Sequence, residues 1–263
     1  MSDKLGAIYT KSEKELVNAM RIEFLDEAID DLHALDVSLD AVRNKNKDLD
    51  KFIDEVRRLT LPLRGQASNY GARLMGTVAH RMENYVGDVK TLPPRFFDDI
   101  QGFIDTLLDL AEGRISFDAD PSEVVRALPA KFGFELGDIE VRNVEVMLVM
   151  LHGAATHFVE REMHQCGYRI SIVTSIFDAI PLIVRTKPDL VITSAIMPEL
   201  EGIDLVIALV SMPSTRNIPS ALITSLDPED EHLKLVPGSV PIIFKGPSFG
   251  DDLAEALSRL FVI

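Results

Sequence analysis

The sequence predicts two domains of different class, an all-α antiparallel four-helix bundle followed by a doubly wound α/β domain with five parallel strands. Two changes in the apolar pattern indicate this order. Apolar residues follow a helical spacing over the first 112 residues and lose it over 113–143. After that they gather in short continuous runs that alternate with helical segments, as in α/β domains. A chain of 263 residues is long enough for two such domains.

The helical domain, residues 1–112, contains four amphipathic segments. In the second, Phe52, Val56 and Leu63 form one apolar stripe. The fourth starts at two prolines and ends near a glycine, as helices prefer. Four such helices with short connections predict an antiparallel bundle. The expected helices cover residues 12–35, 46–70, 72–87 and 93–113.

The connection between the domains covers residues 113–143. Its composition predicts a linker with one short helix at Pro121–Leu128. Because it is long for a plain connection, part of it is expected to pack on one of the domains.

The α/β domain, residues 144–263, contains five apolar runs. Two of them, at 144–151 and 189–193, are continuously apolar, which is typical of strands buried on both faces of a parallel sheet. Helical segments near 154–166, 176–186, 199–211 and 249–261 lie between or after the runs. The expected strands are 144–151, 168–174, 189–193, 218–224 and 240–244.

Composition excludes several classes of function. The net charge of −15 is spread along the chain without a basic stripe, so nucleic acid is not expected as a partner. The single cysteine, Cys166, rules out an intrachain disulfide framework and fits a reducing compartment. Because there is no signal-like start and no run of about 18 apolar residues, we expect a cytoplasmic protein without a membrane segment.

Three motifs in the α/β domain fall in a characteristic order: "MPELEG" at 197–202, Thr224 at the end of the fourth strand and Lys245 after the fifth. With them, residues 143–263 closely resemble the receiver domains of response regulators. The resemblance implies a flavodoxin-like fold and a phosphoacceptor at the end of the third strand. Ser194 stands at that position.

The residues that receiver chemistry needs are missing. Receivers hold Mg²⁺ with acidic residues after the first strand, whereas residues 150–153 here are Met, Leu, His and Gly. A serine without a metal or a base is a poor phosphoacceptor. Thr224 and Lys245 remain as remnants of the pattern. We therefore expect a degenerate receiver without enzymatic activity, cofactor or metal ion.

A metal site elsewhere is a weaker alternative. His157, Glu160 and His164 fall on one face of an expected helix, but two of these spacings match no standard ligand motif. A solvated helix face is the favoured interpretation.

The stretch "RRLTLPLRGQASNYGARL" places Leu61 opposite the apolar stripe of its helix. Its "LPLRGQASNYGA" part (61–72) resembles the histidine-phosphotransfer (HPt) signature H-x-L-K/R-G-x-A-x-N-x-G-A, and Leu61 replaces the acceptor histidine. Pro62 is a second departure, since it removes a backbone hydrogen bond. A lone exposed leucine needs no function. A leucine ringed by cations, however, is typical of a protein contact. The expected interaction surface comprises Arg57, Arg58, Leu61, Arg64, Gly65 and Ser68.

Together these features predict a non-catalytic adaptor of two-component signalling, a degenerate HPt domain joined to a degenerate receiver. Its expected partners are receiver domains, histidine kinases or effectors. One alternative is an active phosphorelay protein that uses an atypical acceptor such as His80, which lies off the apolar stripe of its helix and is expected to be accessible. Another is a homodimer formed through the receiver-like domain, an analogy from the family alone.

Overall fold

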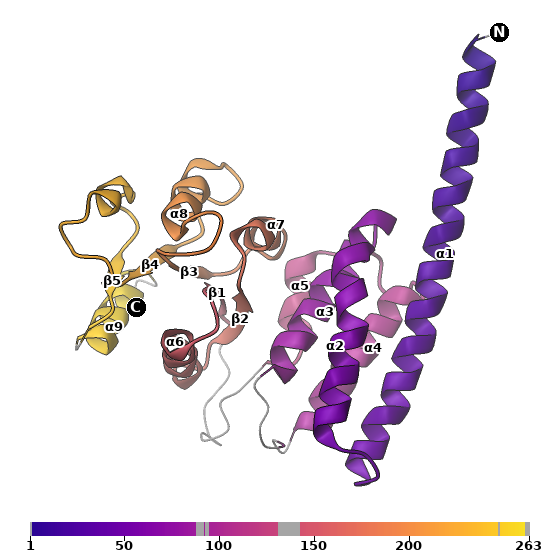
Figure 1. Cartoon of the computed structure of the whole chain (residues 1–263), viewed down its shortest axis with the longest axis horizontal. Helices are drawn as coiled ribbons and strands as arrows, with labels where there is room; N and C mark the ends of the chain where they lie inside the picture. The colour runs from indigo at the N-terminus through magenta and orange to yellow at the C-terminus, as the bar shows by residue number, and fades with distance from the viewer. Residues whose placement is uncertain (1, 88–91, 93–94, 131–142, 247, 261–263) are drawn as a thin grey trace. The chain divides into compact units, whose positions relative to one another are not determined.

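The computed structural model describes residues 2–87, 92, 95–130, 143–246 and 248–260, and the chain divides into two compact units, Met1–Ala130 and Lys131–Ile263. The first unit is helical and the second is an α/β unit with a parallel sheet, so the predicted fold classes and their order are confirmed (Figure 1). The helices of the first unit are α1 (Ser2–Arg43), α2 (Leu49–Gln66), the 3-10 helix η1 (Ala67–Tyr70), α3 (Arg73–Val86), α4 (Phe96–Ala111) and α5 (Pro121–Ala127).

The four long helices of the first unit form a closed bundle. Helix α2 packs on α3, α1 packs on α2 and α4, and α3 packs on α4, so that each helix has two neighbours. The apolar stripes read from the sequence meet along the axis of this bundle. Its largest fully buried side chains include Phe52, Phe96, Phe103, Leu32 and Leu107.

Two helices differ in extent from the sequence expectation. Helix α1 starts at Ser2 and ends at Arg43. It continues past residue 35 because Leu39 and Val42 extend its buried stripe. The second expected helix instead ends at Gln66 and continues as one 3-10 turn, which Gly71 closes with a φ of 73°. Neither α1 nor any other described helix is long and apolar enough to cross a membrane.

Part of the predicted linker belongs to the bundle. The short helix expected at Pro121–Leu128 is α5, and the Asp120 side chain caps it by accepting the Ser122 N–H at 2.8 Å. Val125 and Leu128 are buried in the bundle core. Residues 131–142 of the predicted linker lie outside the described residues.

The second unit is built on a five-stranded parallel sheet with strand order β2-β1-β3-β4-β5. All strands run in the same direction, and the order in which successive strands are added to the sheet reverses between β1 and β3, as in doubly wound folds. The elements are β1 (Glu145–Val149), α6 (Ala154–Gln165), β2 (Arg169–Val173), α7 (Ile176–Thr186), β3 (Leu190–Ser194), α8 (Gly202–Ser211), β4 (Ser220–Thr224), η2 (Glu231–Leu235), β5 (Ile242–Phe244) and α9 (Phe249–Leu260).

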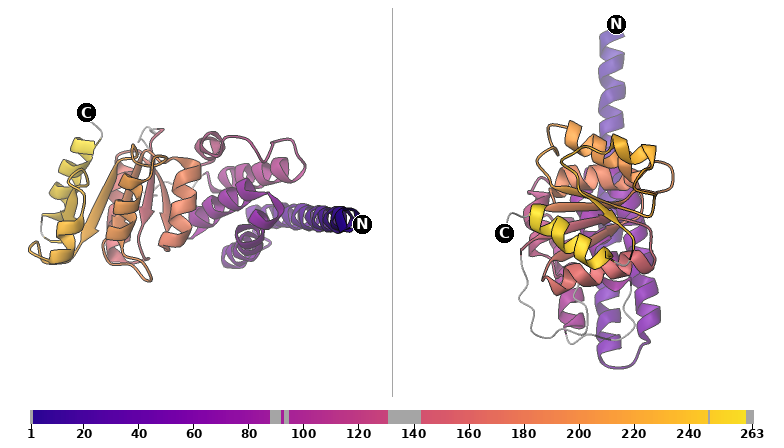
Figure 2. Two further views of the ribbon diagram at one scale, coloured as in Figure 1. Left: turned by 90° about the horizontal axis from the view of Figure 1, so that it is seen from above. Right: turned by 90° about the vertical axis from the view of Figure 1, so that its left-hand side faces the viewer.

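Helices cover both faces of the sheet. Val146 and Leu148 of β1 share one apolar cluster with residues of α6 and α9, whereas Met147 and Val149 share another with residues of α7 and α8. In Figures 1 and 2 these helix pairs lie on opposite sides of the strands. With both faces covered, the carboxyl edge of the sheet is left for ligands or partners.

Candidate functional site

Leu61 is the centre of an exposed face on α2. Its side chain is 70% exposed although the residue is large and apolar. All five other residues of the expected interaction surface are exposed as well: four lie on α2 within two turns of Leu61, and Ser68 lies in η1, which follows directly. We call these residues the Leu61 face: Arg57, Arg58, Leu61, Arg64, Gly65 and Ser68.

The arginines of the Leu61 face are paired with carboxylates of the same unit. Arg57 Nη1 lies 3.3 Å from Asp54 Oδ1, and Arg58 Nη2 lies 4.0 Å from a Glu55 oxygen. Arg64 forms an ion pair with Glu83 on α3. These pairs offset the positive charge of the face, so its exposed apolar centre is the feature that sets it apart from an ordinary charged helix surface.

Two glycines near Leu61 have different roles. A Cβ on Gly76 of α3 would lie 3.2 Å from the Leu63 carbonyl oxygen, so glycine there allows α2 and α3 to pack closely. A Cβ on Gly65 would meet nothing within 4 Å. The packing of the unit therefore does not require a glycine at position 65, and the bare backbone there faces open space.

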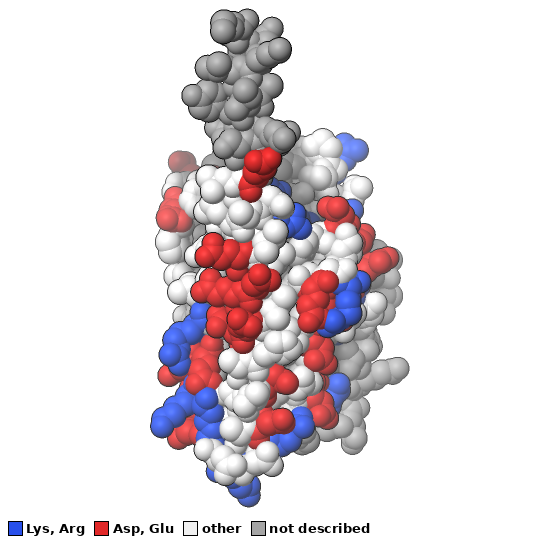
Figure 3. Space-filling view, turned by 90° about the vertical axis from the view of Figure 1, so that its right-hand side faces the viewer, with Lys and Arg blue, Asp and Glu red and all other residues white. Residues whose placement is uncertain are grey.

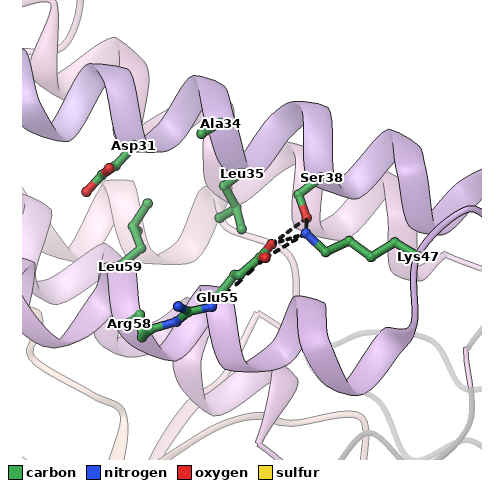
Figure 4. Close-up of a pocket in the computed structure, with 8 residues that line it drawn as sticks. All are labelled: Asp31, Ala34, Leu35, Ser38, Lys47, Glu55, Arg58 and Leu59. Atoms are coloured by element: carbon green, nitrogen blue, oxygen red, sulfur yellow. Dashed lines mark hydrogen bonds and ion pairs between the residues drawn. The ribbon is translucent and has the colours of Figure 1, made fainter.

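A cavity of about 350 Å³ adjoins the Leu61 face between α1 and α2 (Figure 4). Arg58 belongs both to this cavity and to the Leu61 face, and buried Leu35 and Leu59 form apolar parts of its wall. The apolar pattern of the sequence does not reveal this cavity, because its residues come from two helices and from the loop between them. It is lined by Asp31, Ala34, Leu35, Ser38, Lys47, Glu55, Arg58 and Leu59.

One end of the cavity is fixed by a polar network. Lys47 Nζ donates to both carboxylate oxygens of Glu55, each at 2.6 Å, and to Ser38 Oγ at 2.7 Å. Burial raises the pKa of the Glu55 carboxyl. The hydrogen bonds from Lys47 and Ser38 and the nearby positive charges outweigh burial, so the pKa lies below its ordinary value of 4.5. The network thus ties the α1–α2 loop to α2 while Glu55 is ionised.

The Glu55 network should make stability depend on pH. Since the folded pKa is lowered, the network stabilises the fold above pH 4.5 and loses this contribution as pH falls through the folded pKa. Lys47→Met should cost about 1 kcal/mol at pH 7 and flatten the pH dependence in the acid range. Urea unfolding of both proteins between pH 3 and 7 measures this. A constant difference between them across that range would contradict the assigned network.

His80 is not accessible as the sequence analysis expected. Its residue is only 9% exposed, and its Nε2 lies 3.2 Å from the Asn84 amide nitrogen on the same helix. The expectation was wrong because α3 is buried over a wider arc than its apolar stripe suggests; Thr77 and Ala79 are buried too. A partner that exchanges phosphate would not reach this imidazole without movement of α3.

The carboxyl edge of the sheet holds the receiver-like remnants. Ser194 is the last residue of β3, and Thr224 ends β4 with its Oγ1 accepting the Leu226 N–H at 3.0 Å. Lys245 is exposed directly after β5. After β1 the edge offers Leu151, a histidine and a glycine instead of carboxylates. This donor set does not suit Mg²⁺, which prefers carboxylate oxygens.

Exposed apolar side chains stand at this edge instead. Leu151 follows β1 and is 48% exposed, Phe177 follows β2 and is 57% exposed, and Ile196 follows β3 and is 56% exposed. These three strands are neighbours in the sheet, so their carboxyl ends lie at one edge. Phe177 and Ile196 were not among the residues predicted from the sequence; the signal that could have found them is an apolar residue shortly after each strand. We call Leu151, Phe177 and Ile196 the edge triad.

The two histidines and the glutamate that were considered as a metal site lie close together on α6. They do not form a solvated helix face. Glu160 and His164 are buried, with Glu160 Oε1 3.7 Å from His164 Nε2. His157 Nδ1 lies 3.6 Å from the other oxygen of Glu160. The expectation of a solvated face was wrong for Glu160 and His164, which are buried, whereas the His157 side chain is 55% exposed. Among the described residues, no group of three or more His, Cys, Asp or Glu is arranged to hold a metal ion.

The second unit has the strand order of receiver domains, and comparison with solved structures returns receiver domains. The chain is similar to the receiver domain of a signal-transduction histidine kinase from Syntrophus aciditrophicus, with 26% identity over 45% of this chain and 90% of that one and a TM-score of 0.41. It is also similar to the receiver domain of the sensor histidine kinase PA1611 from Pseudomonas aeruginosa PAO1 (18% identity, 46% and 98% coverage, TM-score 0.41). A third similar structure is the chemotaxis response regulator CheY4 of Vibrio cholerae, with 20% identity over 44% of this chain and 98% of that one and a TM-score of 0.39.

No protein-family model matches the chain, and no curated protein is significantly similar to it. The similarity of the second unit to receivers therefore rests on its own strand order and on the motifs at its carboxyl edge. The likeness of the first unit to HPt domains rests on the motif around Leu61 and stays a prediction.

Proposed function

We propose that the chain is a non-catalytic adaptor of two-component signalling, which binds receiver domains, histidine kinases or effectors without passing phosphate. The observation that carries this proposal is Leu61, which is 70% exposed at the position of an acceptor histidine. Leucine has no nucleophile, but an exposed apolar side chain bordered by arginines suits the centre of a protein interface.

The second unit supports the same function. Its carboxyl edge presents the edge triad where a receiver would hold a metal ion and a phosphoryl group. Ser194 at the end of β3 is a poor acceptor without a base or a metal ion. Both units thus pair a missing acceptor with exposed apolar side chains, which favours binding over group transfer.

Binding is tested with Leu61→Glu, using receiver domains and histidine kinases from the same genome as probes. Placing a carboxylate at the apolar centre of the interface should weaken binding at least about tenfold. Val37→Glu is the matched control, since Val37 is 71% exposed on α1 and lies outside the Leu61 face. Equal loss in both variants, or no loss in Leu61→Glu, would count against the Leu61 face as the docking surface.

Gly65→Ala separates binding from stability. Because a Cβ there meets nothing within 4 Å, alanine should stabilise the first unit by up to about 1 kcal/mol. The same methyl group should weaken partner binding by holding the partner away from the helix backbone. A variant that gains stability and keeps full affinity would show that no partner approaches Gly65.

The absence of phosphotransfer is tested by incubating the protein with phosphoramidate and Mg²⁺ and measuring its intact mass. We expect no phosphate adduct. An adduct that His80→Ala abolishes would instead support the alternative of an active relay with an atypical acceptor. The burial of His80 counts against that alternative.

A further inference from the structure

The first half of α1 extends past the bundle. Where α1 reaches the rest of its unit, Arg21 lies over the Phe117 ring at 5.2 Å and Phe24 stacks on Tyr70 at 4.9 Å. Every residue from Glu15 to Met20 is exposed. Figures 1 and 2 show this part of α1 rising beyond the other helices of its unit. We call residues 2–23 the projecting segment.

The projecting segment carries an exposed apolar stripe. Leu16, Val17 and Met20 are 62%, 53% and 44% exposed, and at 100° per residue they fall within about 100° of one another. The stripe leads into Phe24, which starts the buried stripe of α1 in the bundle core. The face that packs inside the bundle therefore continues, uncovered, from Phe24 back to Leu16.

A helix of this kind needs a partner. Most helix stability in proteins comes from packing of an apolar face, and a helix without such packing is marginal in water. The chain's acidity would oppose self-association, but it is unevenly distributed along α1. Residues 2–23 carry four basic and four acidic side chains, whereas residues 24–43 carry six carboxylates and one arginine. Figure 3 shows acidic side chains gathered along the outer face of the first unit.

This charge distribution favours a second copy of the chain as the partner, and it favours antiparallel pairing of the two helices. Two neutral segments can approach each other, whereas a parallel pairing would also bring the two acidic parts of α1 side by side. Antiparallel pairing places the acidic parts at opposite ends of a contact about 33 Å long, the length of 22 helical residues. We propose that two copies of this chain dimerise through antiparallel pairing of their projecting segments along the stripe of Leu16, Val17 and Met20.

The three stripe residues alone are too few for a stable interface, which needs about 800 Å² from each partner. The pairing must therefore extend over more of α1 than these three residues. This dimer goes beyond the proposed adaptor function and does not depend on it, and it would present two copies of each docking surface.

Sedimentation velocity of the full chain over a wide concentration range tests the proposal. The natural chain, of 29.2 kDa, should sediment as a dimer at micromolar concentration. The double variant Leu16→Glu, Met20→Glu should raise the dimer dissociation constant by about 100-fold or more, since it places carboxylates in an apolar contact. Ile22→Glu is the matched control, because Ile22 is 53% exposed in the same segment but on the opposite face. It should leave the dimer intact.

Three results would overturn the proposal. The first is a natural chain that stays monomeric at high micromolar concentration. The second is a dimer that survives the double variant, as expected if the chain associates through its receiver-like unit. The third is equal loss of the dimer in Ile22→Glu, which would show that the stripe face is not the interface. A monomeric double variant that still binds partners through the Leu61 face would leave the adaptor function untouched.

Discussion

Gly202→Ala should destabilise the second unit by about 3 kcal/mol or more. A Cβ at this position would lie 2.0 Å from the Ser194 carbonyl oxygen and 2.9 Å from Thr193 Oγ1. Overpacking a well-packed site usually costs about 1–3 kcal/mol, and here the obstructing atom is main chain that cannot rotate away. The Gly202 N–H also donates to the Ala195 carbonyl at 2.8 Å, which holds the start of α8 against the end of β3.

The measurement is denaturant unfolding of the full chain, followed by circular dichroism, with Gly238→Ala as the control. A Cβ on Gly238 would meet nothing within 4 Å, so that variant should stay within about 0.5 kcal/mol of the natural chain. If Gly202→Ala were as mild as the control, the close approach between β3 and the start of α8 would be wrong. The position of Ser194 would then be in doubt as well.

Gly202 also shows which features can be predicted from the sequence and which need the structure. It was read from the sequence only as the last residue of the "MPELEG" motif. The motif and the alternation of strands and helices were sufficient to predict the fold class of the second unit, because both are local patterns. The reason for the glycine, a contact with the carbonyl of the preceding strand, becomes visible only once β3 and α8 are placed in space.

In the helical unit, too, the sequence predicted the local features but not those that depend on how the helices pack. The apolar spacing predicted the helices and the exposure of Leu61, since Leu61 lies opposite the buried stripe of α2. The spacing did not predict that His80 would be buried, because that depends on how broadly the neighbouring helices cover α3. It also did not reveal the cavity beside Arg58, which requires α1, α2 and the loop between them.

The edge triad could be predicted from the sequence only in part. Leu151 stands in the sequence where a receiver has acidic residues, so the absence of a Mg²⁺ site is a prediction that comes from that loop alone. The side chains of Phe177 and Ile196 become part of the same surface only through the strand order, which makes β2, β1 and β3 neighbours. A pattern along the chain gives the end of each strand but not the order of the strands.

Arg169→Met should cost about 3 kcal/mol or more of stability, because it removes the guanidinium that pairs with the buried Glu145 carboxylate. Arg169 Nε donates to Glu145 Oε1, across the first residues of β2 and β1. The Glu145 side chain is 3% exposed. Asp189 lies at the same end of the sheet, where its Oδ2 accepts the Glu145 N–H at 2.8 Å. Without Arg169, two carboxylates would share this end of the sheet, and removing one partner of a buried ion pair typically costs about 3–5 kcal/mol.

A double-mutant cycle separates charge from packing. Glu145→Gln combined with Arg169→Met removes the buried charge together with its partner, so the double variant should regain at least about 1 kcal/mol relative to Arg169→Met alone. Urea unfolding of the four proteins at pH 7 measures this. If the double variant were no more stable than Arg169→Met, the loss would come from the packing of the arginine stem. Because Glu145 and Arg169 lie at the amino ends of their strands, partner binding at the carboxyl edge should persist in every variant that folds.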